Sequence, residues 1–244
     1  MKILLLPFIT LSLVAQEPSR EKNALDKVEL PGVTVNVKEK AVDVASMICL
    51  NEGPLEFIAC TKNTKEHESL IRTEAKPSHI HAALLLIGAK AGHPAIRKMV
   101  GEEEQARFID LPPKGSPIGV SLVINGKDGK KTERLISDFV ARINYDEETE
   151  EPKIESTAEE FKTFLFAGSH LHGPEGQPKV YLADNSGSVI SLSTFGDELL
   201  CLPGVHAKVN QALQWEVNPK HVPKVESKVL LRLRPLKEKE NADK

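Results

Sequence analysis

The densest group of reactive side chains lies in CTKNTKEHESL, residues 60–70, where a thiol, an imidazole and two carboxylates share one short segment. The candidate catalytic residues there are Cys60, Glu66, His67 and Glu68. His67 is the best candidate for a proton carrier, because the pKa of an unperturbed imidazole is about 6.5. Cys60 and His67 are also the residue types of a thiolate–imidazolium pair, since a nearby cation lowers the pKa of a thiol. The chemistry that these residues suggest is acid–base hydrolysis.

The backbone conformation of this segment decides whether those groups can act together. If it is a strand, Lys65, His67 and Ser69 point to one side while Glu66 and Glu68 point to the other, so the two carboxylates do not clasp the imidazole. If it is a turn, Glu66 and His67 can converge. A third interpretation, which the sequence favours, is a polar loop in which threonine and asparagine side chains cap the backbone.

Four histidines are weak candidates for metal ligands, with zinc as the metal they would suit: His67, His81, His170 and His172. His81 forms an H-x-H pattern with His79, but a helix would place the two rings about 200° apart. His170 and His172 follow the strand-like FLFAGS, where a metal-free surface loop is the favoured interpretation. No motif requires a cofactor.

Several classes of protein are excluded by missing motifs. The sequence contains no C-x-x-C, no P-loop, no G-x-G-x-x-G and no G-x-S-x-G pattern. The formal net charge of −3 lacks the basic excess of a nucleic-acid-binding protein, and aromatic residues make up only 5% of the chain. We therefore expect no nucleic-acid partner.

The N-terminus has the layout of a secretory signal peptide. Lys2 precedes the apolar run 3–14, and small Ala15 offers a cleavage point. We expect a signal peptide at residues 1–15, a linker at 16–30 and a charged, disordered tail at 236–244. No second long apolar run is present, so we expect no membrane span after signal removal and a periplasmic or secreted protein.

Export affects how the three cysteines are interpreted. In an oxidising compartment two of Cys49, Cys60 and Cys201 could pair, but their spacing does not choose the pair. A buried unpaired cysteine that acts as a small hydrophobe is favoured for at least one.

Short strands joined by turns dominate the remaining pattern. Hairpins are predicted at three turns, 51–54, 125–129 and 185–187, and further strands at 33–37, 161–168, 212–217 and 228–235. The segment 77–87, PSHIHAALLLI, predicts a helix that is apolar nearly all round and therefore buried. The expected fold is a single α+β domain, with mostly antiparallel hairpins around that one helix.

The chain resembles the YdjY-type domain of exported bacterial proteins. The resemblance covers residues 31–235 and is carried by LEFIACTKNTKEHESLI, HAALLLIGAKAGHP, PPKGSPIGVSLVI, FLFAGS and YLADNSGSVISLSTFGDELL. Its most specific part is TKEHES, residues 64–69. The resemblance implies one exported domain and supplies no reaction, substrate or cofactor.

Two functions follow, and the sequence leaves open whether the chain is an enzyme. The favoured function is a non-catalytic binding or structural role toward a protein, a glycan or a small molecule. The alternative is a metal-dependent or His/Glu hydrolase centred on TKEHES, with His81 or Cys60 supplied from a neighbouring element. Convergence of these side chains within about 6 Å would favour the enzyme, because perturbed groups cluster at active sites.

Overall fold

The computed structural model describes residues 26–101, 106–126, 129–145, 152–156, 159–206 and 215–237 of the 244-residue chain. The signal peptide predicted at 1–15 and most of the tail predicted at 236–244 lie outside these ranges. Strand β1, Lys27–Leu30, lies within the segment predicted as a linker.

Short strands make up most of the described chain. They are β1 Lys27–Leu30, β2 Val33–Asn36, β3 Ala41–Ile48, β4 Phe57–Thr61, β5 Ser69–Thr73, β6 Ala91–His93, β7 Ile96–Val100, β8 Arg107–Leu111, β9 Lys114–Gly115, β10 Pro117–Asn125, β11 Lys131–Leu135, β12 Val140–Tyr145, β13 Pro152–Ser156, β14 Phe164–Leu165, β15 Leu171–His172, β16 Val180–Tyr181, β17 Ser188–Ser191, β18 Leu200–Cys201, β19 Trp215–Val217 and β20 Lys228–Pro235. The described α-helices are α1 Pro77–Leu86 and α2 Leu182–Ser186, and short 3₁₀ turns lie at Glu66–Glu68, Ile136–Asp138 and Glu160–Lys162.

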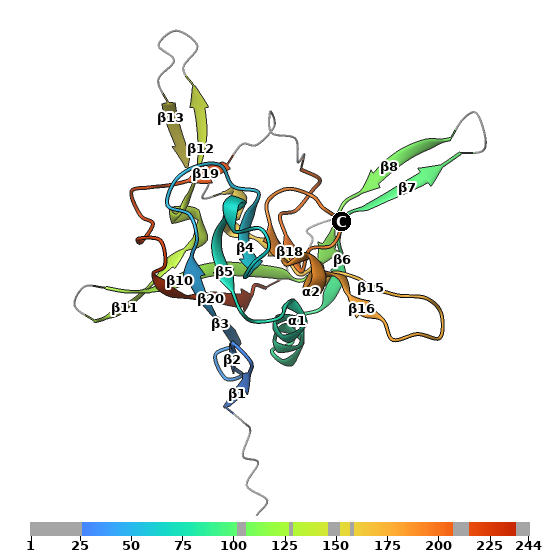
Figure 1. The fold of residues 1–244 in the computed structure, drawn as a ribbon, viewed down its shortest axis with the longest axis horizontal. Helices are drawn as coiled ribbons and strands as arrows, with labels where there is room; N and C mark the ends of the chain where they lie inside the picture. Colours follow the sequence, from blue (N-terminus) through green and yellow to red (C-terminus); the bar gives the residue numbers. More distant parts are fainter. Residues whose placement is uncertain are drawn as a thin grey trace, which may run out of the picture.

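Eight of the described strands close into a barrel, which overturns the predicted α+β fold (Figure 1). Their order is β3-β20-β10-β14-β18-β17-β4-β5, and the ring closes because β5 also pairs with β3. Closure removes the free edges that an open sheet would expose. The prediction failed because closure depends on strands far apart in the sequence, which local patterns do not reveal.

Alternating burial along β20 shows how the barrel core is filled. Val229, Leu231 and Leu233 are buried, and Leu231 pairs with Leu122 of β10 on one side and Val44 of β3 on the other. Both of these partners are also completely buried. Each such side chain contributes about 1.5–3 kcal/mol on leaving water, so strand side chains, and not a central helix, supply the core.

The side chains of β20 that point away from the core form an ionic network on the outer face of the barrel. Arg232 donates to Asp43 at 2.6 and 2.7 Å and to Glu133 at 2.8 Å, while Arg234 also pairs with Glu133. The hydrogen bond from Arg234 lowers the pKa of Glu133 to about 2, with help from Ser121 and Arg232 and against the opposing effect of burial.

The lowered pKa of Glu133 predicts acid sensitivity. Its folded pKa lies below the unfolded value of 4.5, so its stabilisation is complete above about pH 4.5 and disappears as the pH falls toward about 2. Glu133→Gln should therefore be less stable than wild type near neutrality, and this difference should shrink in that acidic window. Urea unfolding across the pH range measures it, with exposed Glu175→Gln as the control; a difference independent of pH would contradict the prediction.

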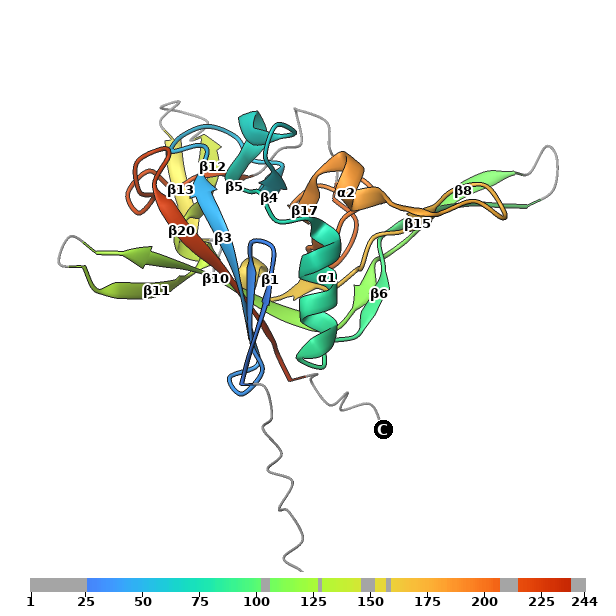
Figure 2. The same ribbon diagram turned by 60° about the horizontal axis from the view of Figure 1, so that its bottom comes forward.

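Helix α1 forms where the sequence predicts it, but it is not buried all round. Ile80 and Leu84 are completely buried, whereas Leu85 and Leu86 are 49% and 54% exposed. The helix lies beside β2 and β3 on the outside of the barrel (Figure 2). Only one face packs, so the expectation of a helix at the centre of the domain was wrong. Among the described residues, no helix is long and apolar enough to cross a bilayer.

Helix α2 replaces the hairpin predicted around residues 185–187. Gly187 takes a left-handed conformation, φ +78°, and its N–H bonds to the carbonyl of Ala183, so it ends a helix instead of turning a hairpin. From α2, the Asp184 carboxylate accepts hydrogen bonds from the N–H and hydroxyl of Ser78 at 2.8 and 2.7 Å. Asp184 thus caps the first turn of α1 and ties the two helices together.

The hairpin predicted at 51–54 is also wrong, because the strands on either side do not pair with each other. Both β3 and β4 pair with β5, antiparallel and parallel respectively. The hairpin predicted at 125–129 is confirmed, since β10 and β11 pair antiparallel across it.

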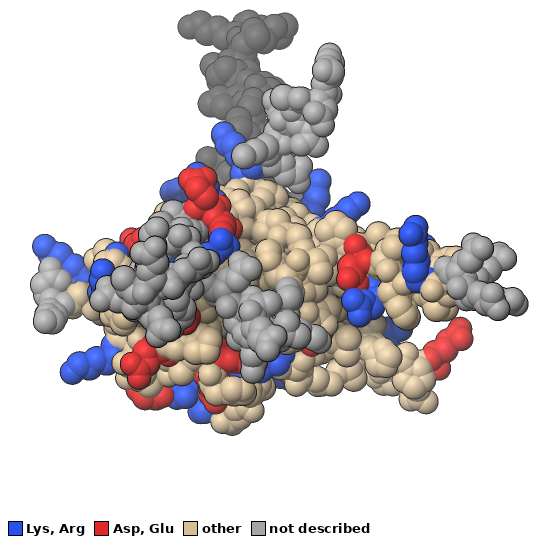
Figure 3. Space-filling model, turned by 90° about the horizontal axis from the view of Figure 1, so that it is seen from above, with Lys and Arg blue, Asp and Glu red and all other residues tan. Residues whose placement is uncertain are grey.

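Among the described strands, β7–β8, β10–β11, β12–β13 and β15–β16 pair into arms that extend from the barrel (Figures 1 and 2). The arms β7–β8 and β15–β16 leave the barrel in the same general direction in both views. Figure 3 shows that acidic and basic side chains are interspersed on the face seen from above.

Candidate functional site

The TKEHES segment connects two parallel strands. Strand β4 ends at Thr61 and β5 begins at Ser69, and the two strands run side by side in the same direction. Residues 62–68 must therefore return along β4, a connection shorter than the usual crossover of about a dozen residues. This geometry folds the motif over the sheet.

Local hydrogen bonds hold the segment in place. The Thr64 hydroxyl donates to the Thr61 carbonyl and the Ser69 hydroxyl to the Lys65 carbonyl, each at 2.6 Å. The Asn63 N–H donates to Glu66 Oε1 at 3.2 Å. The motif is thus a hydrogen-bonded polar loop in which Thr64 caps the backbone as expected, while the second cap comes from Ser69 and Asn63 takes part through its backbone N–H.

Lys65 anchors the loop to the barrel. Its Nζ lies 4.4 and 4.8 Å from the ring centroids of Phe57 and Phe195, which stack on each other, and donates to the hydroxyl of buried Ser188 at 2.7 Å. A cation held by two ring faces and a hydroxyl is well compensated for its lost water. The sequence analysis missed this role, because no local signal joins residue 65 to 195.

Cys60 lies completely buried beneath this loop. A hydrogen bond from the Cys49 thiol, followed by contacts to the Ser69 hydroxyl, the Lys65 N–H and the Thr64 hydroxyl, lowers the pKa of Cys60 to about 6 against the opposing effect of burial. Ser69 has one hydroxyl proton and also reaches the Lys65 carbonyl. The Cys49 thiol also has one proton and donates to the Met47 carbonyl at 3.9 Å, so the Lys65 N–H is the dependable donor to the sulfur.

The predicted catalytic residues do not assemble. The His67 side chain is 78% exposed, with its Nε2 3.7 Å from Glu68, while Glu66 pairs with Arg72 at 3.4 Å. Cys60 is sealed in the interior and contacts a different set of groups. His67 and Glu68 thus meet at the exposed surface, while Cys60 lies apart from them in the interior, so the four candidate residues are not brought into one site.

A second constellation lies at α1 and β16. His81 Nδ1 is 2.8 Å from the hydroxyl oxygen of Tyr181, and that hydroxyl donates to the carbonyl of Gly168 at 2.8 Å. With the Tyr181 proton directed at the Gly168 carbonyl, we assign Nδ1 of His81 as the donor to the Tyr181 oxygen and Nε2 as the acceptor. The imidazole and the Phe166 ring form a T-shaped contact, with ring centroids 4.8 Å apart.

Burial lowers the pKa of His81, so its ring is neutral near pH 7. Burial also raises the pKa of Tyr181, with a smaller contribution from Asp184, so the phenol keeps its proton. The arrangement is a fixed, uncharged hydrogen-bond relay.

This relay borders a cavity of about 430 Å³, which we call the His81 pocket; its lining includes Ser78, His81, Leu85, His170, Leu171 and Tyr181. Two of the four histidines predicted as metal ligands, His81 and His170, thus reach one pocket. His172 is exposed and is not part of the lining, and His79 instead approaches the Pro31 carbonyl at 3.5 Å. The predicted separation of His79 and His81 by the helix is confirmed.

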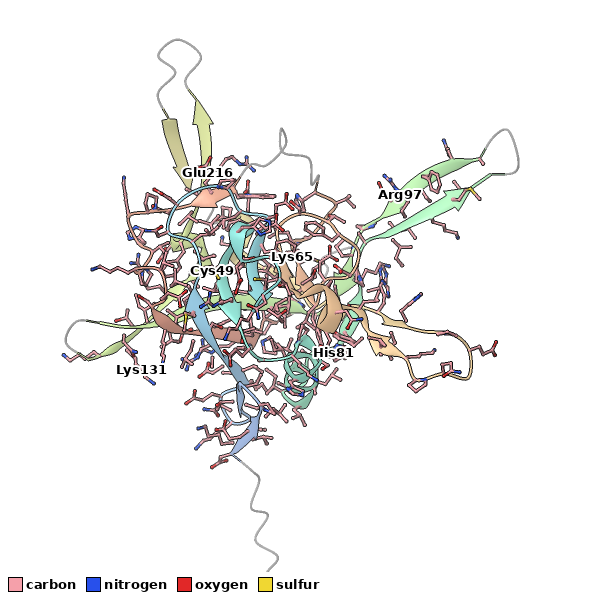
Figure 4. All side chains as sticks on the ribbon, viewed as in Figure 1. Cys49, Lys65, His81, Arg97, Lys131 and Glu216 are labelled. Atoms are coloured by element: carbon pink, nitrogen blue, oxygen red, sulfur yellow. The ribbon has the colours of Figure 1, made fainter. Side chains whose placement is uncertain are left out.

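The described residues contain no group of three or more histidine, cysteine or acidic side chains that could hold a metal ion. The zinc alternative therefore has no ligand set in this part of the chain. Figure 4 shows that His81 lies on α1, away from both Cys49 and Lys65, so the two constellations are separate.

The fold and sites define a β-barrel domain with a clamped polar loop and a pocket on its outer side. A family model described as the YdjY domain matches residues 33–234, and the chain therefore belongs to the YdjY domain family. No curated protein and no solved structure matches the sequence.

Proposed function

We propose that this chain is an exported, non-catalytic binding domain and that the His81 pocket takes a small amphipathic molecule. Export is supported by the sequence pattern of residues 1–15. A non-catalytic role is supported by the dispersal of Cys60, Glu66 and His67 into different surroundings.

The observation that carries this proposal is that one pocket is lined by an uncharged hydrogen-bond acceptor, the His81 imidazole, and by exposed leucines. Leu85 and Leu171 line the pocket and are 49% and 64% exposed. Exposed apolar groups around a concave site are typical of ligand binding, and a volume of 430 Å³ suits a small molecule.

The tautomer of His81 indicates the chemistry of the ligand. A neutral ring with Nε2 as acceptor favours a ligand that donates a hydrogen bond and disfavours one that needs a cation. We therefore expect an apolar body that carries an N–H or O–H group. Indole has these properties, and indene has the same shape without the N–H.

The test titrates the protein with indole and indene by NMR. We expect indole to bind with shifts confined to the His81 pocket and indene to bind several-fold more weakly, since the Nε2 acceptor then lacks a partner. Binding of indole should stay level from about pH 8 to about pH 6.5 and weaken as the pH falls through the lowered pKa of His81. His170 is the other imidazole that lines the pocket. Repeating the titration with His170→Asn therefore assigns the remaining pH dependence of indole binding to His81.

Two adjacent leucines provide matched variants. Leu85→Glu places a carboxylate in the pocket and should weaken indole binding about tenfold or more. Leu86→Glu adds the same charge at a residue that is 54% exposed and outside the lining, and should change binding less than about twofold. Equal effects of the two variants, or equal affinity for indole and indene, would refute the proposed pocket.

A further inference from the structure

Another cavity, which we call the Arg97 pocket, lies at the base of the β7–β8 arm. It has a volume of about 610 Å³, and its lining includes Arg97, Asp110, Thr194, Phe195, Val205 and His206. Its walls are the start of the arm and the loops that follow β17 and β18. An added Cβ on Gly196 would lie 3.6 Å from the Ala95 carbonyl oxygen, so the arm and the loop after β17 meet there. Figure 4 places Arg97 on the arm, apart from His81, so this cavity is separate from the His81 pocket.

The wall formed by the arm carries a fixed pair of opposite charges. Arg97 and Asp110 are paired across β7 and β8, so their side chains share one face of the arm. Arg97 Nε lies 2.9 Å from Asp110 Oδ1 and Nη2 lies 3.2 Å from Oδ2, a two-point contact. The guanidinium carbon also lies 5.9 Å from the Phe108 ring centroid. The hydrogen bond raises the pKa of Arg97 and lowers the pKa of Asp110, so both groups are charged at neutral pH.

Hydrogen bonds hold the opposite wall in place. The Thr194 N–H donates to the His206 carbonyl at 3.0 Å, and the His206 N–H donates to Thr194 Oγ1 at 2.8 Å. The N–H groups of Phe195 and Gly196 both donate to the carboxylate of buried Glu198. A wall fixed in this way loses little conformational freedom when a ligand binds.

Both walls keep groups that a ligand can use. A guanidinium has five N–H donors, and two of those of Arg97 are directed at Asp110. The Asp110 carboxylate has further lone pairs that can accept from an ammonium group. Thr194 is the acceptor in its bond with His206, so its hydroxyl proton can be donated to a ligand carboxylate. Val205, which is 47% exposed, supplies apolar surface beside these polar groups.

The charge pair selects the charge of the ligand. Because Arg97 and Asp110 together are neutral, a lone anion or a lone cation is attracted by one of them and repelled by the other. A molecule with both charges on adjacent groups is attracted by both residues without breaking their pair. We propose that the Arg97 pocket binds an apolar α-amino acid, whose carboxylate faces Arg97 and whose ammonium group faces Asp110. The side chain of the amino acid then lies against Phe195 and Val205.

The test titrates the isotope-labelled, full-length protein with L-phenylalanine and follows the backbone amides by NMR. We expect shifts at residues 194–196 and 205–206. Hydrocinnamate and phenethylamine each lack one of the two charges and should bind about tenfold more weakly or less. Glycine keeps both charges without the apolar side chain and should bind several-fold more weakly. Equal affinity for L-phenylalanine and its singly charged analogues, or unmoved amides at these residues up to about 10 mM ligand, would overturn the proposal.

Two variants test the contacts separately. Arg97→Gln should weaken L-phenylalanine and hydrocinnamate about tenfold and leave phenethylamine no weaker than in wild type. Asp110→Asn should weaken L-phenylalanine and phenethylamine by a similar factor and leave hydrocinnamate no weaker. Lys98→Gln removes the same charge as Arg97→Gln from the opposite face of β7 and should change each affinity less than about twofold.

The pattern across the ligands separates binding from a structural role. If Arg97→Gln and Asp110→Asn weaken all of the ligands equally, the pair supports the arm and does not contact the ligand, which contradicts the proposal. The dispersion of the NMR spectra shows whether each variant is folded. Titration of the same variants with indole tests the His81 pocket independently, so the failure of one site is distinguishable from the failure of the other.

Discussion

Gly187→Ala should lower the free energy of unfolding by about 3 kcal/mol or more, one of the two largest effects that we expect from a single substitution. Gly187 has φ +78°, which costs a residue with a side chain about 1–3 kcal/mol. An added Cβ would also lie 2.4 Å from Thr64 Oγ1 and 2.6 Å from Thr61 Oγ1, closer than real contacts allow. Urea denaturation followed by Trp215 fluorescence measures the loss.

Gly53→Ala separates the two causes. Gly53 also has a positive φ, +94°, but nothing lies within 4 Å of its added Cβ. It should therefore show only the conformational cost, about 1 kcal/mol. If both substitutions cost the same, the packing of α2 against the TKEHES loop is looser than the contacts of Gly187 indicate.

Features fixed by local patterns were predictable from the sequence. The segment 77–87 contains a proline for the first turn, strong helix formers and a following glycine, and α1 spans Pro77–Leu86. The turn at 125–129 similarly predicted the β10–β11 hairpin. In both cases the decisive residues are neighbours in the chain.

The barrel was not predictable in this way, because its closing contacts join distant segments. A turn between two strand-like runs was interpreted as a hairpin at 51–54, yet β5 enters between those strands. At 185–187, the glycine that was assigned to a hairpin ends helix α2. The run LADN before Gly187 carries a helix signal, since leucine and alanine favour helices and glycine favours the position after the last turn.

For the candidate site, too, the local motif was predictable from the sequence, whereas the long-range contacts were not. The sequence directed attention to the correct motif, and family membership is now established over residues 33–234. The most reactive residue type in the motif, His67, lies at the surface, while the tertiary contacts are made by Lys65 and Cys60. Residue type alone predicts which chemistry a side chain can do, but burial and long-range partners decide which side chains are used.

Lys65→Ala is the second substitution for which we expect a large effect, about 3 kcal/mol of unfolding free energy. It removes a cation held by the rings of Phe57 and Phe195, an interaction worth about 2 kcal/mol when desolvated. It also removes the donor 2.7 Å from the buried hydroxyl of Ser188, which keeps only the longer hydrogen bond from the Ser186 hydroxyl, at 3.2 Å, among the side-chain donors to it in the described residues. Lys65→Met keeps most of the aliphatic stem and should recover part of the loss. Denaturant unfolding of wild type and the two variants under reducing conditions measures these differences in unfolding free energy.

His67→Ala is the matched control within the same motif. Its side chain is 78% exposed, so its removal should change the unfolding free energy by less than about 0.5 kcal/mol. A large loss for Lys65→Ala together with none for His67→Ala would mean that the motif clamps the loop over Cys60 through its lysine. The reverse order would contradict this account, because it would require His67 to have a buried partner that the described structure does not give it. The exposed histidine would then have to be considered again as the centre of the motif.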